Sequence, residues 1–577
     1  MSDTNHGVTR RQIISGLGGV AALGAVSLAS SRAGAEGKWN HEADVIVVGT
    51  GIAATTAAYI ARRKGNSVTM LEKAGYFGGT TAKSAGVLWI PNNFILRQRG
   101  IDDNKADCLR YLARFSFPQR YNPSHPTLGL DQHAYSLLEA FYDNSATAVD
   151  VLREQNVLKL HEWRMFHLDN DAPDYLAVPE NKVPSGRALG VTIGDGTTGL
   201  GAHLMQQMKA AIDKQKIPVM LEHRVERAVL NEHGRVVGIE AAHGDKTMTF
   251  KARKAVVFAT GGYAHNTLFI DNYQRGHIYG ACASPASTGD FINIAGAAGA
   301  RMGNLSSAWR TQILLEPALA DRALSSGVFF PPGDSMLQVN RYGRRVVNEK
   351  RNYNDRTEVH NTYNPTYAEF PNQIMFMVYD KRTAEAFAGA YPLPAEPTDA
   401  AYVMQADTPK KLAAVISKRL RKISSHTGGF ELDASFAENL QATIARFNEF
   451  ARAGNDEDFQ RGAAAYDREW QLVFSPMREQ SGWPQNEQPN ITMHSLSDNG
   501  PYFAIMLAAG ALDTNGGPMV DAKARVLDTR GQPIPGLYAA GNCIASPSGD
   551  AYWAAGCTIG LALTFGYIAG NAAHDEA

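Results

Sequence analysis

One stretch near the beginning of the chain, ADVIVVGTGIAATTAAYIARRKGNSVTMLEK (residues 43–73), constrains the fold more than any other. Residues 43–48 form a short apolar run that ends at a glycine, as a buried parallel strand does. Residues 52–64 are rich in alanine and end in basic side chains, which predicts a helix. Residues 67–71 predict a second strand. Such a strand–helix–strand unit is the building block of a parallel α/β sheet.

The turn inside this unit carries the motif GxGxxA, formed by Gly49, Gly51 and Ala54, and Glu72 closes the second strand. Glycines at such a turn let the backbone approach a pyrophosphate, and the helix amides and dipole point toward it. An acidic residue about twenty positions further on can accept hydrogen bonds from a ribose 2′-hydroxyl. We therefore expect a dinucleotide site here.

Four later segments share one pattern, a strand or turn followed by small residues. They are GYFGGTTAKSAGVLWIPNN (75–93), AVVFATGG (255–262), STGDFINIAGAAGA (287–300) and GLYAAGNC (536–543). Each alone would be an ordinary strand-to-helix turn. Together they indicate an elongated cofactor bound by segments from both ends of the chain.

Composition excludes several other classes. A chain of 577 residues is too long for one simple core, so two or more domains are expected. Lys plus Arg total 56 against 57 for Asp plus Glu, which leaves no positive surplus for nucleic acid. The four cysteines have no CxxC or CxxCH spacing, so we expect no structural zinc, iron–sulfur cluster or attached haem, and no metal site.

Residues 1–35 differ from the rest. The pair Arg10-Arg11 precedes a weakly apolar Gly/Ala-rich run that ends at Ala33-Gly34-Ala35. This order is typical of a twin-arginine export signal, and it predicts a mature protein in the periplasm. The alternative is a disordered basic tail on a cytoplasmic protein.

The motifs VIVVGTGIAATTAA, FGGTTAKSAG, ATGG, TGD and GLYAAGN together resemble those of the fumarate reductase/succinate dehydrogenase-like FAD flavoprotein family. The resemblance covers essentially the whole chain after the signal. It implies an α/β fold in which a Rossmann-like FAD-binding domain (38–300 and 513–577) is interrupted by an α+β catalytic cap domain (301–512).

The resemblance also implies which residues bind FAD. Some relatives hold FAD covalently through a histidine, but the corresponding run here is Thr80-Thr81-Ala82, so non-covalent FAD is expected. Besides Gly49, Gly51, Ala54 and Glu72, the implied cofactor residues are Lys73, Gly79, Thr80, Thr81, Ser84, Ala85, Gly86, Val225, Gly261, Asp290, Gly541, Asn542 and Ile559.

Three positions separate the branches of this family. Fumarate reductases carry an arginine four residues after the Glu of a GKRFVNE-like motif, whereas GRRVVNEKRNYNDR (343–356) has Tyr353 there. A second arginine, which follows HGAN, corresponds to Tyr552, and the histidine of HTxGG corresponds to Asp513, to which we assign no catalytic role. Tyrosine cannot supply the bidentate cationic contacts that a dicarboxylate needs. Fumarate reduction is therefore not expected.

The sequence is more similar to the 3-ketosteroid Δ1-dehydrogenase branch. That branch has tyrosines after NExxPY, in SGxxYxxxG and in PDY, and this chain has Tyr353 in NEKRNY, Tyr552 and Gly556 in SGDAYWAAG, and Tyr175 in APDY. The similarity implies that Tyr552 and the Gly556 amide bind the C3 ketone as a small oxyanion hole. Tyr353, supported by Tyr175, removes the C2 proton while a hydride leaves C1 for flavin N5, which gives a 1(2)-ene-3-one.

Several points stay open. Asn352 replaces the usual proline, YWAAG is bulkier than its counterpart, and Trp553 is expected to form a wall of the pocket. The expected substrate is a small apolar, steroid-like ketone. The expected electron acceptor is an external carrier such as a quinone. A sterol-like substrate would also make peripheral contact of the protein with a membrane reasonable. One alternative is an FAD-dependent reductase that saturates the enone of an uncharged ketone substrate. The other is a flavoprotein that has no substrate of its own and serves only in binding or electron transfer.

Overall fold

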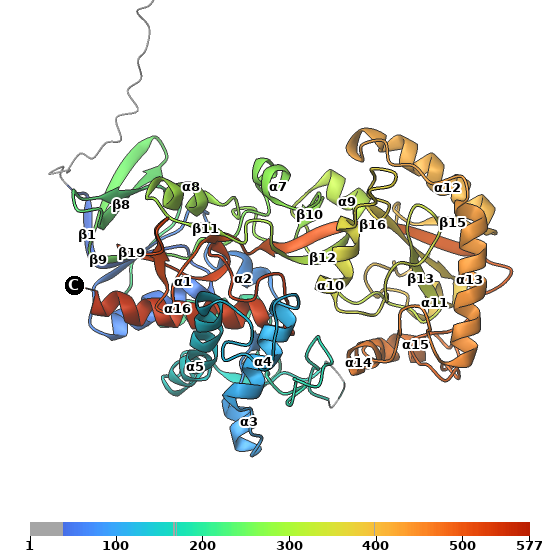
Figure 1. The fold of residues 1–577 in the computed structure, drawn as a ribbon, viewed down its shortest axis with the longest axis horizontal. Helices are drawn as coiled ribbons and strands as arrows, with labels where there is room; N and C mark the ends of the chain where they lie inside the picture. Colours follow the sequence, from blue (N-terminus) through green and yellow to red (C-terminus); the bar gives the residue numbers. More distant parts are fainter. Residues whose placement is uncertain (1–38, 166–167, 169, 195, 397–398, 577) are drawn as a thin grey trace, which may run out of the picture.

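The computed structural model describes residues 39–576 apart from 166–167, 169, 195 and 397–398. Figure 1 shows two lobes side by side: one contains both ends of the described chain, in blue and red, and the other contains its yellow and orange middle part. The predicted export signal, residues 1–35, lies outside the described residues.

The first lobe is built on a sheet whose strands come from both ends of the described chain. Its strands are β1 (His41–Val48), β2 (Val68–Leu71), β6 (Val219–Met220), β7 (Arg224–Leu230), β8 (Val236–His243), β9 (Lys246–Phe258), β18 (Arg525–Leu527) and β19 (Pro533–Ala539). They follow the order β18-β19-β9-β1-β2-β6, and β7 and β8 extend the sheet from β9. β1 runs parallel to β2 and β9, and β9 runs parallel to β19.

The sequence of β1 explains its central place. Val45, Ile46 and Val47 have almost no exposed surface, because layers cover both faces of the sheet and a buried parallel strand reads as a continuous apolar run. Helix α1 (Ile52–Arg63) leads from β1 to β2, and α16 (Cys557–Asp575) packs along α1. The predicted strand–helix–strand unit and the α/β class are thus confirmed.

A mostly helical segment lies below this sheet in Figure 1. Its elements are α2 (Gly79–Lys83), β3 (Leu88–Trp89), α3 (Phe94–Gln98), α4 (Lys105–Ser116), α5 (Gln132–Glu154), β4 (Leu160–Glu162), β5 (Ala188–Val191) and α6 (Gly201–Lys214). The short strands β3, β5 and β4 form a small antiparallel sheet. Strand β3 of this sheet contacts α16.

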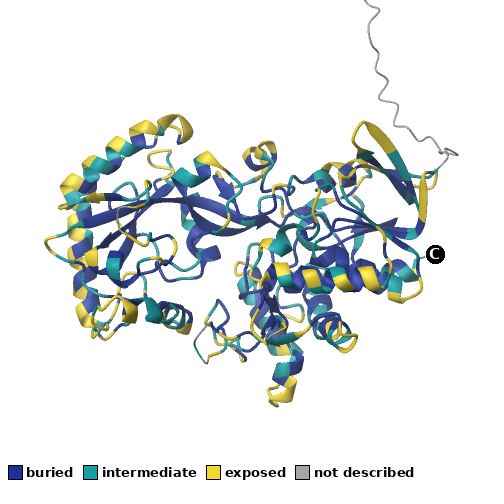
Figure 2. Ribbon diagram, turned by 180° about the vertical axis from the view of Figure 1, so that it is seen from behind, coloured by how far each residue is buried: buried dark blue, intermediate teal, exposed yellow. Residues whose placement is uncertain are grey.

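The second lobe is organised around the long strand β16 (Tyr502–Thr514), which pairs with four others. The other strands of its sheet are β10 (Gly280–Ala281), β12 (Ala308–Leu314), β13 (Met336–Val339), β14 (Ile374–Asp380) and β15 (Met404–Ala406). The α-helices between β9 and β16 in the chain are α7 (Thr267–Tyr273), α8 (Asp290–Ala297), α9 (Leu315–Ala320), α10 (Tyr353–Thr357), α11 (Lys381–Ala386), α12 (Pro409–Lys422), α13 (Phe436–Ala453), α14 (Ala465–Leu472) and α15 (Ser475–Gln480). In Figure 2 the strands of this sheet are coloured as buried, and the helices at the outer edge of the lobe are exposed on their outer side.

Strand β16 also joins the two lobes. Its last residues, Asp513 and Thr514, reach the first lobe and continue into β17 (Gly517–Pro518), which pairs with β11 (Met302–Gly303). The strand therefore crosses the predicted boundary between residues 512 and 513, and β10 pairs with it although β10 precedes residue 301. The predicted domain limits stay a prediction.

In the part of the chain that the structure describes, no helix combines the length and apolarity that crossing a bilayer requires.

Candidate active site

An elongated cavity of about 130 Å³ lies at the carboxyl ends of β1, β2, β9 and β19. In an α/β sheet this edge is where nucleotide ligands bind, because the loops that follow parallel strands meet there. The predicted segments after these four strands, residues 49–51, 72–73, 259–261 and 541–542, all line the cavity. The first and last parts of the chain thus build one site.

The glycine turn after β1 leaves room for a phosphate group. Gly49 has φ +108°, and a β-carbon on it would lie 2.3 Å from the Ala259 carbonyl oxygen, so only glycine fits. A β-carbon on Gly51 would have only Thr81 Oγ1 near it, at 3.5 Å, which means that a larger side chain would fill the cavity instead. Gly51 is the N-cap of α1, whose free amides favour an anion.

The part of this cavity next to Glu72 and Lys73 suits a ribose. Glu72 is buried, and its carboxylate accepts hydrogen bonds from Thr50 Oγ1 at 2.7 Å and from the Ala74 amide at 2.9 Å. Lys73 Nζ lies 2.9 Å from Asp290 Oδ2, which ties the end of β2 to α8. These contacts fix the carboxylate where the motif predicts a ribose contact, so the residues present fit FAD.

Nearly all predicted cofactor residues face the two adjoining cavities of the site. Those that line the elongated cavity are Gly49, Gly51, Glu72, Lys73, Gly79, Thr80, Thr81, Ser84, Val225, Gly261, Asp290, Gly541, Asn542 and Ile559. Ala85 and Gly86 line the neighbouring cavity. Ala54 lines neither cavity: it is fully buried in α1, where a small residue lets the helix pack closely on the sheet.

The second cavity, of about 280 Å³, adjoins the first. Six residues line both: Thr80, Ser84, Asp513, Asn542, Thr558 and Ile559. Tyr175, Tyr353, Tyr552 and Gly556 all line the second cavity, although they lie far apart in the sequence. The structure thus brings together every predicted catalytic residue beside the cofactor cavity.

The three tyrosines form one compact cluster. The Tyr175 hydroxyl donates a hydrogen bond to the Tyr353 hydroxyl oxygen at 3.0 Å, and the ring centroids of this pair are 5.5 Å apart. The Tyr552 ring lies 5.3 Å from that of Tyr353 and stacks on that of Tyr175 at 5.6 Å. Every ring of the cluster therefore contacts the other two, which holds the hydroxyls in fixed relative positions.

Burial controls the acidity of these phenols. It raises the pKa of Tyr353 well above its usual range, because the charged phenolate would lose its contact with water. Burial likewise raises the pKa of Tyr552 to about 12, although a hydrogen bond with Tyr353 works in the opposite direction. Tyr353 is therefore neutral at pH 7, and it can act as a base only after its own proton has left.

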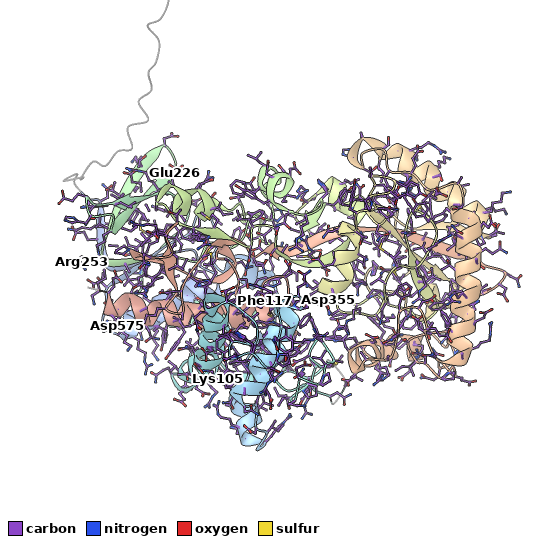
Figure 3. All side chains as sticks on the ribbon, in the orientation of Figure 1. Lys105, Phe117, Glu226, Arg253, Asp355 and Asp575 are labelled. Atoms are coloured by element: carbon purple, nitrogen blue, oxygen red, sulfur yellow. The ribbon has the colours of Figure 1, made fainter. Side chains whose placement is uncertain are left out.

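Different hydrogen bonds position each of the three tyrosines. Asn352, at the position where relatives have proline, is the N-cap of α10: its side chain accepts a hydrogen bond from the Asp355 amide at 2.9 Å. Asn354 Nδ2 donates to the Asp550 carbonyl at 2.9 Å and so ties α10 to the loop that carries Tyr552. Asp355 is labelled in Figure 3, where α10 faces the first lobe.

Tyr175 is fixed through its sequence neighbour and its backbone. The Asp174 carboxylate is buried and accepts hydrogen bonds from Trp89 Nε1 at 2.8 Å and from Arg187 at 2.6 Å. The Tyr175 amide donates to the Trp553 carbonyl at 2.9 Å. The PDY element is therefore tied to the loop that carries Tyr552.

Trp553 itself is not a pocket wall, contrary to the sequence-based expectation. It has no exposed surface, its indole donates to Ser116 Oγ at 2.9 Å, and its ring packs against Trp89 and Phe141 at 5.6 and 5.3 Å. Because neighbouring residues of an extended loop point to opposite sides, Tyr552 faces the cavity and Trp553 faces the core.

Gly556 is the N-cap of the 19-residue helix α16 and has φ +90°. A β-carbon here would lie 2.7 Å from the Trp89 nitrogen, so the loop can approach β3 only with glycine at this position. The helix dipole places partial positive charge at this end. A carbonyl oxygen between the Tyr552 hydroxyl and the Gly556 amide would therefore be stabilised as it gains negative charge.

Aromatic side chains that sequence reasoning did not single out complete the second cavity. Phe330 stacks on Trp470 at 3.8 Å, Trp163 lies 6.0 Å from Trp470, and Trp309 contacts Tyr552 at 6.1 Å. They come from four separate segments that have no common motif, so no local signal in the sequence could have found them. These rings make most of the cavity wall apolar.

The two cavities and the tyrosine cluster define a flavin-dependent dehydrogenase site, and relatives of the chain agree with this. Residues 44–559 match the family described as FAD binding domain. The chain is 31% identical to 4-oxocyclohexanecarboxylate 2-dehydrogenase of Sinomonas cyclohexanicum, with 92% of each chain covered. It is 30% identical to 3-oxosteroid 1-dehydrogenase of Mycolicibacterium smegmatis, with 92% of this chain and 96% of that protein covered.

The chain therefore belongs to the FAD binding domain family, and it is an FAD-dependent oxidoreductase related to 3-oxosteroid 1-dehydrogenases. The fold agrees: it superposes on 3-ketosteroid Δ1-dehydrogenase of Sterolibacterium denitrificans, solved with 1,4-androstadiene-3,17-dione, with a TM-score of 0.75, 24% identity and coverage of 93% and 100%. The resemblance drawn from the motifs is confirmed.

Proposed function

We propose that the protein removes two hydrogens from adjacent carbons beside a ring ketone, and that 3-oxosteroids, desaturated between C1 and C2, are the first substrates to test. The observation that carries this proposal is the cluster of three phenols at the junction with the cofactor cavity. Relatives named 3-oxosteroid 1-dehydrogenase support the choice of steroid.

The roles follow from the positions of the groups. The Tyr552 hydroxyl and the Gly556 amide hold the ketone oxygen, which makes the hydrogens on the neighbouring carbon more acidic. Tyr353 accepts one of them as a proton, and the Tyr175 hydroxyl donates to the Tyr353 oxygen and stabilises its negative charge. FAD, when bound, supplies the acceptor for the hydride that leaves the next carbon.

The direction of the reaction and its electron acceptor are part of the same proposal. The two electrons taken from the ketone pass to an external carrier such as a quinone. The runner-up is the reverse reaction, saturation of an enone, for which the same phenols would serve as proton donors. We place the protein in the periplasm, where a sterol-like substrate would bring it into contact with a membrane surface; Arg10-Arg11 supports this location.

A second substrate class is favoured by the shape of the cavity. A volume of about 280 Å³ lies near the lower end of the roughly 300–1,000 Å³ of small-molecule sites. The stacked pair of Phe330 and Trp470 forms part of the wall of this cavity. A single-ring 4-oxo acid, the kind of molecule named for the Sinomonas relative, is therefore the second candidate.

The test is to incubate the purified holoenzyme and an artificial electron acceptor with a panel of 3-oxosteroids and 4-oxocyclohexane derivatives, and to detect the enone or dienone by mass spectrometry. Anaerobic bleaching of the flavin by the saturated ketone supports oxidation. Reoxidation of reduced flavin by the enone, without the forward reaction, supports the reductase instead. If no ketone bleaches the flavin and no enone reoxidises it, the proposal fails.

A further inference from the structure

One charged side chain in the wall of the substrate cavity has no part in the chemistry proposed above. Of the described residues that line this cavity, Lys83 alone is basic. It is the last residue of α2, in the run FGGTTAKSAG, and it lies in a part of the wall that also includes Cys282 and Ser325. The other walls are mostly aromatic or aliphatic.

The Lys83 ammonium faces this part of the wall without an acidic partner. It donates to the Ala283 carbonyl at 3.0 Å and to the Leu324 carbonyl at 3.2 Å, and among the described residues no carboxylate lies within ion-pair distance of it. An ammonium has three donors, so one is left over. Cys282 lines the same cavity; burial raises the pKa of its thiol to about 12, and the Lys83 charge acts in the opposite direction.

Lys83 is an exposed residue at the edge of a mostly apolar cavity, so its ammonium can be reached by an anionic group of a molecule that enters there. The ammonium gains little from neutral carbonyls alone, and a charge-assisted bond to an anion is roughly twice as strong as a neutral one. Lysine acts as a point charge that suits a single carboxylate oxygen. Asp513, the acidic residue among the lining residues, accepts hydrogen bonds from the Gly262 amide and from Asn542, and within the described part of the chain it forms an ion pair with neither Lys83 nor another cation.

We infer that Lys83 binds a carboxylate carried by the substrate, while Tyr552 and Gly556 hold the ketone of the same molecule. This rests on the proposed function and narrows its substrate class to cyclic ketones that bear a carboxylate away from the ketone. Such a molecule is either a single-ring oxo acid or a 3-oxosteroid whose side chain ends in a carboxylate. Both present the same charge to Lys83.

The competing interpretation is that Lys83 only joins α2 to the segments at Ala283 and Leu324. The test compares kcat/KM for 4-oxocyclohexanecarboxylate and its methyl ester, and for a 3-oxosteroid with a side-chain carboxylate and its methyl ester. The wild-type holoenzyme should prefer the acid of at least one pair by about 10-fold or more, the effect of a charge-assisted hydrogen bond. The pair that shows the preference identifies the ring system.

Lys83→Met should abolish this preference by lowering kcat/KM for the acid alone, and Lys83→Arg should keep most of it. Lys411→Met, on the exposed face of α12, is the matched control and should change nothing. Added salt should raise KM for the acid and leave KM for the ester unchanged. An equal loss for acid and ester in Lys83→Met, or no preference in the wild type, would overturn the inference.

A binding measurement separates this inference from the proposed function. Cyclohexanecarboxylate has no ketone to oxidise, so it can be titrated into the oxidised holoenzyme and followed by the change in flavin absorbance, with cyclohexanecarboxamide as the neutral control. Binding of the acid that depends on Lys83 supports the inference even if no enone forms from any ketone, a result that would contradict the desaturation. Equal binding of acid and amide contradicts the inference and leaves the desaturation standing.

Discussion

At the scale of single residues, Tyr353 and Tyr552 should fail in different ways when each loses its hydroxyl. Tyr353→Phe removes the proton acceptor but keeps the ring contacts, so substrate binding should survive while kcat falls by about 10²-fold or more. Tyr552→Phe removes a donor to the ketone, which should cost about 3 kcal/mol of transition-state stabilisation and weaken binding as well. Steady-state kinetics on the best ketone found would separate the two patterns.

Hydrogen exchange at the carbon beside the ketone, in deuterated water and with flavin-depleted protein, isolates the proton step from hydride transfer. Exchange should require both hydroxyls. A variant that keeps wild-type turnover and exchange would show that its tyrosine is structural and that this assignment of roles is wrong.

The same burial predicts the pH dependence. Because the pKa of Tyr353 is raised, the ionised, proton-accepting form is scarce at pH 7 and grows as the pH rises. We therefore expect kcat/KM to increase by up to about tenfold per pH unit between about pH 7 and 10, and Tyr353→Phe to lose this increase. A flat profile would mean that another group takes the proton.

What the sequence reveals about single residues depends on whether a motif surrounds them. Tyr353, Tyr552 and the glycines stand in motifs whose spacing follows from the turn or helix that they begin, so their places could be predicted. Trp163, Phe330 and Trp470 line the same cavity only because distant segments fold together, and no local pattern marks them. Ala54 matched a motif, but its physical role is packing.

At the scale of elements, the beginning of α16 sets the donor geometry, and it allows a test with a built-in control. Gly556→Ala adds a β-carbon 2.7 Å from the Trp89 nitrogen, whereas Gly531→Ala adds one at φ +80° with nothing within 4 Å. The Gly531 variant should lose about 1–2 kcal/mol of unfolding free energy through backbone strain alone. The Gly556 variant should lose more, and turnover with it, as thermal unfolding and kinetics would show. Equal losses would mean that the close approach to β3 is unimportant.

Substitutions at the beginning of α1 should separate an effect on cofactor binding from an effect on folding. Gly51→Leu places its side chain in the open cavity, so the protein should fold but purify without flavin. Gly49→Ala instead forces a β-carbon against the Ala259 carbonyl, so it should lower the melting temperature even without flavin. Flavin absorbance and circular dichroism would distinguish the two variants.

Acid should release all flavin from the wild-type protein, and flavin that stays with the precipitated protein would contradict non-covalent binding.

At the scale of the whole molecule, the sequence predicted an α/β protein with a discontinuous cofactor domain, because strand–turn–small-residue motifs occur at both ends of the chain. The limits between the lobes were harder to predict. A single strand, β16, crosses between them and buries apolar residues along its whole length, so no change in composition marks the junction. Pairings such as β10 with β16 join residues about 230 positions apart and leave no periodicity in the sequence.

The way the cofactor cavity is built matters for the proposed export to the periplasm. The cofactor cavity is lined by residues from β1 and from α16, so it is complete only after the whole chain has folded. We propose that FAD binds before export, because the twin-arginine route carries folded proteins. Replacing Arg10 and Arg11 by lysine should therefore leave a larger, FAD-containing precursor in the cytoplasm, while the wild type appears in the periplasm as a shorter, yellow protein. Cell fractionation, immunoblotting and flavin content would measure this. If the double variant distributes like the wild type, residues 1–35 are not such a signal.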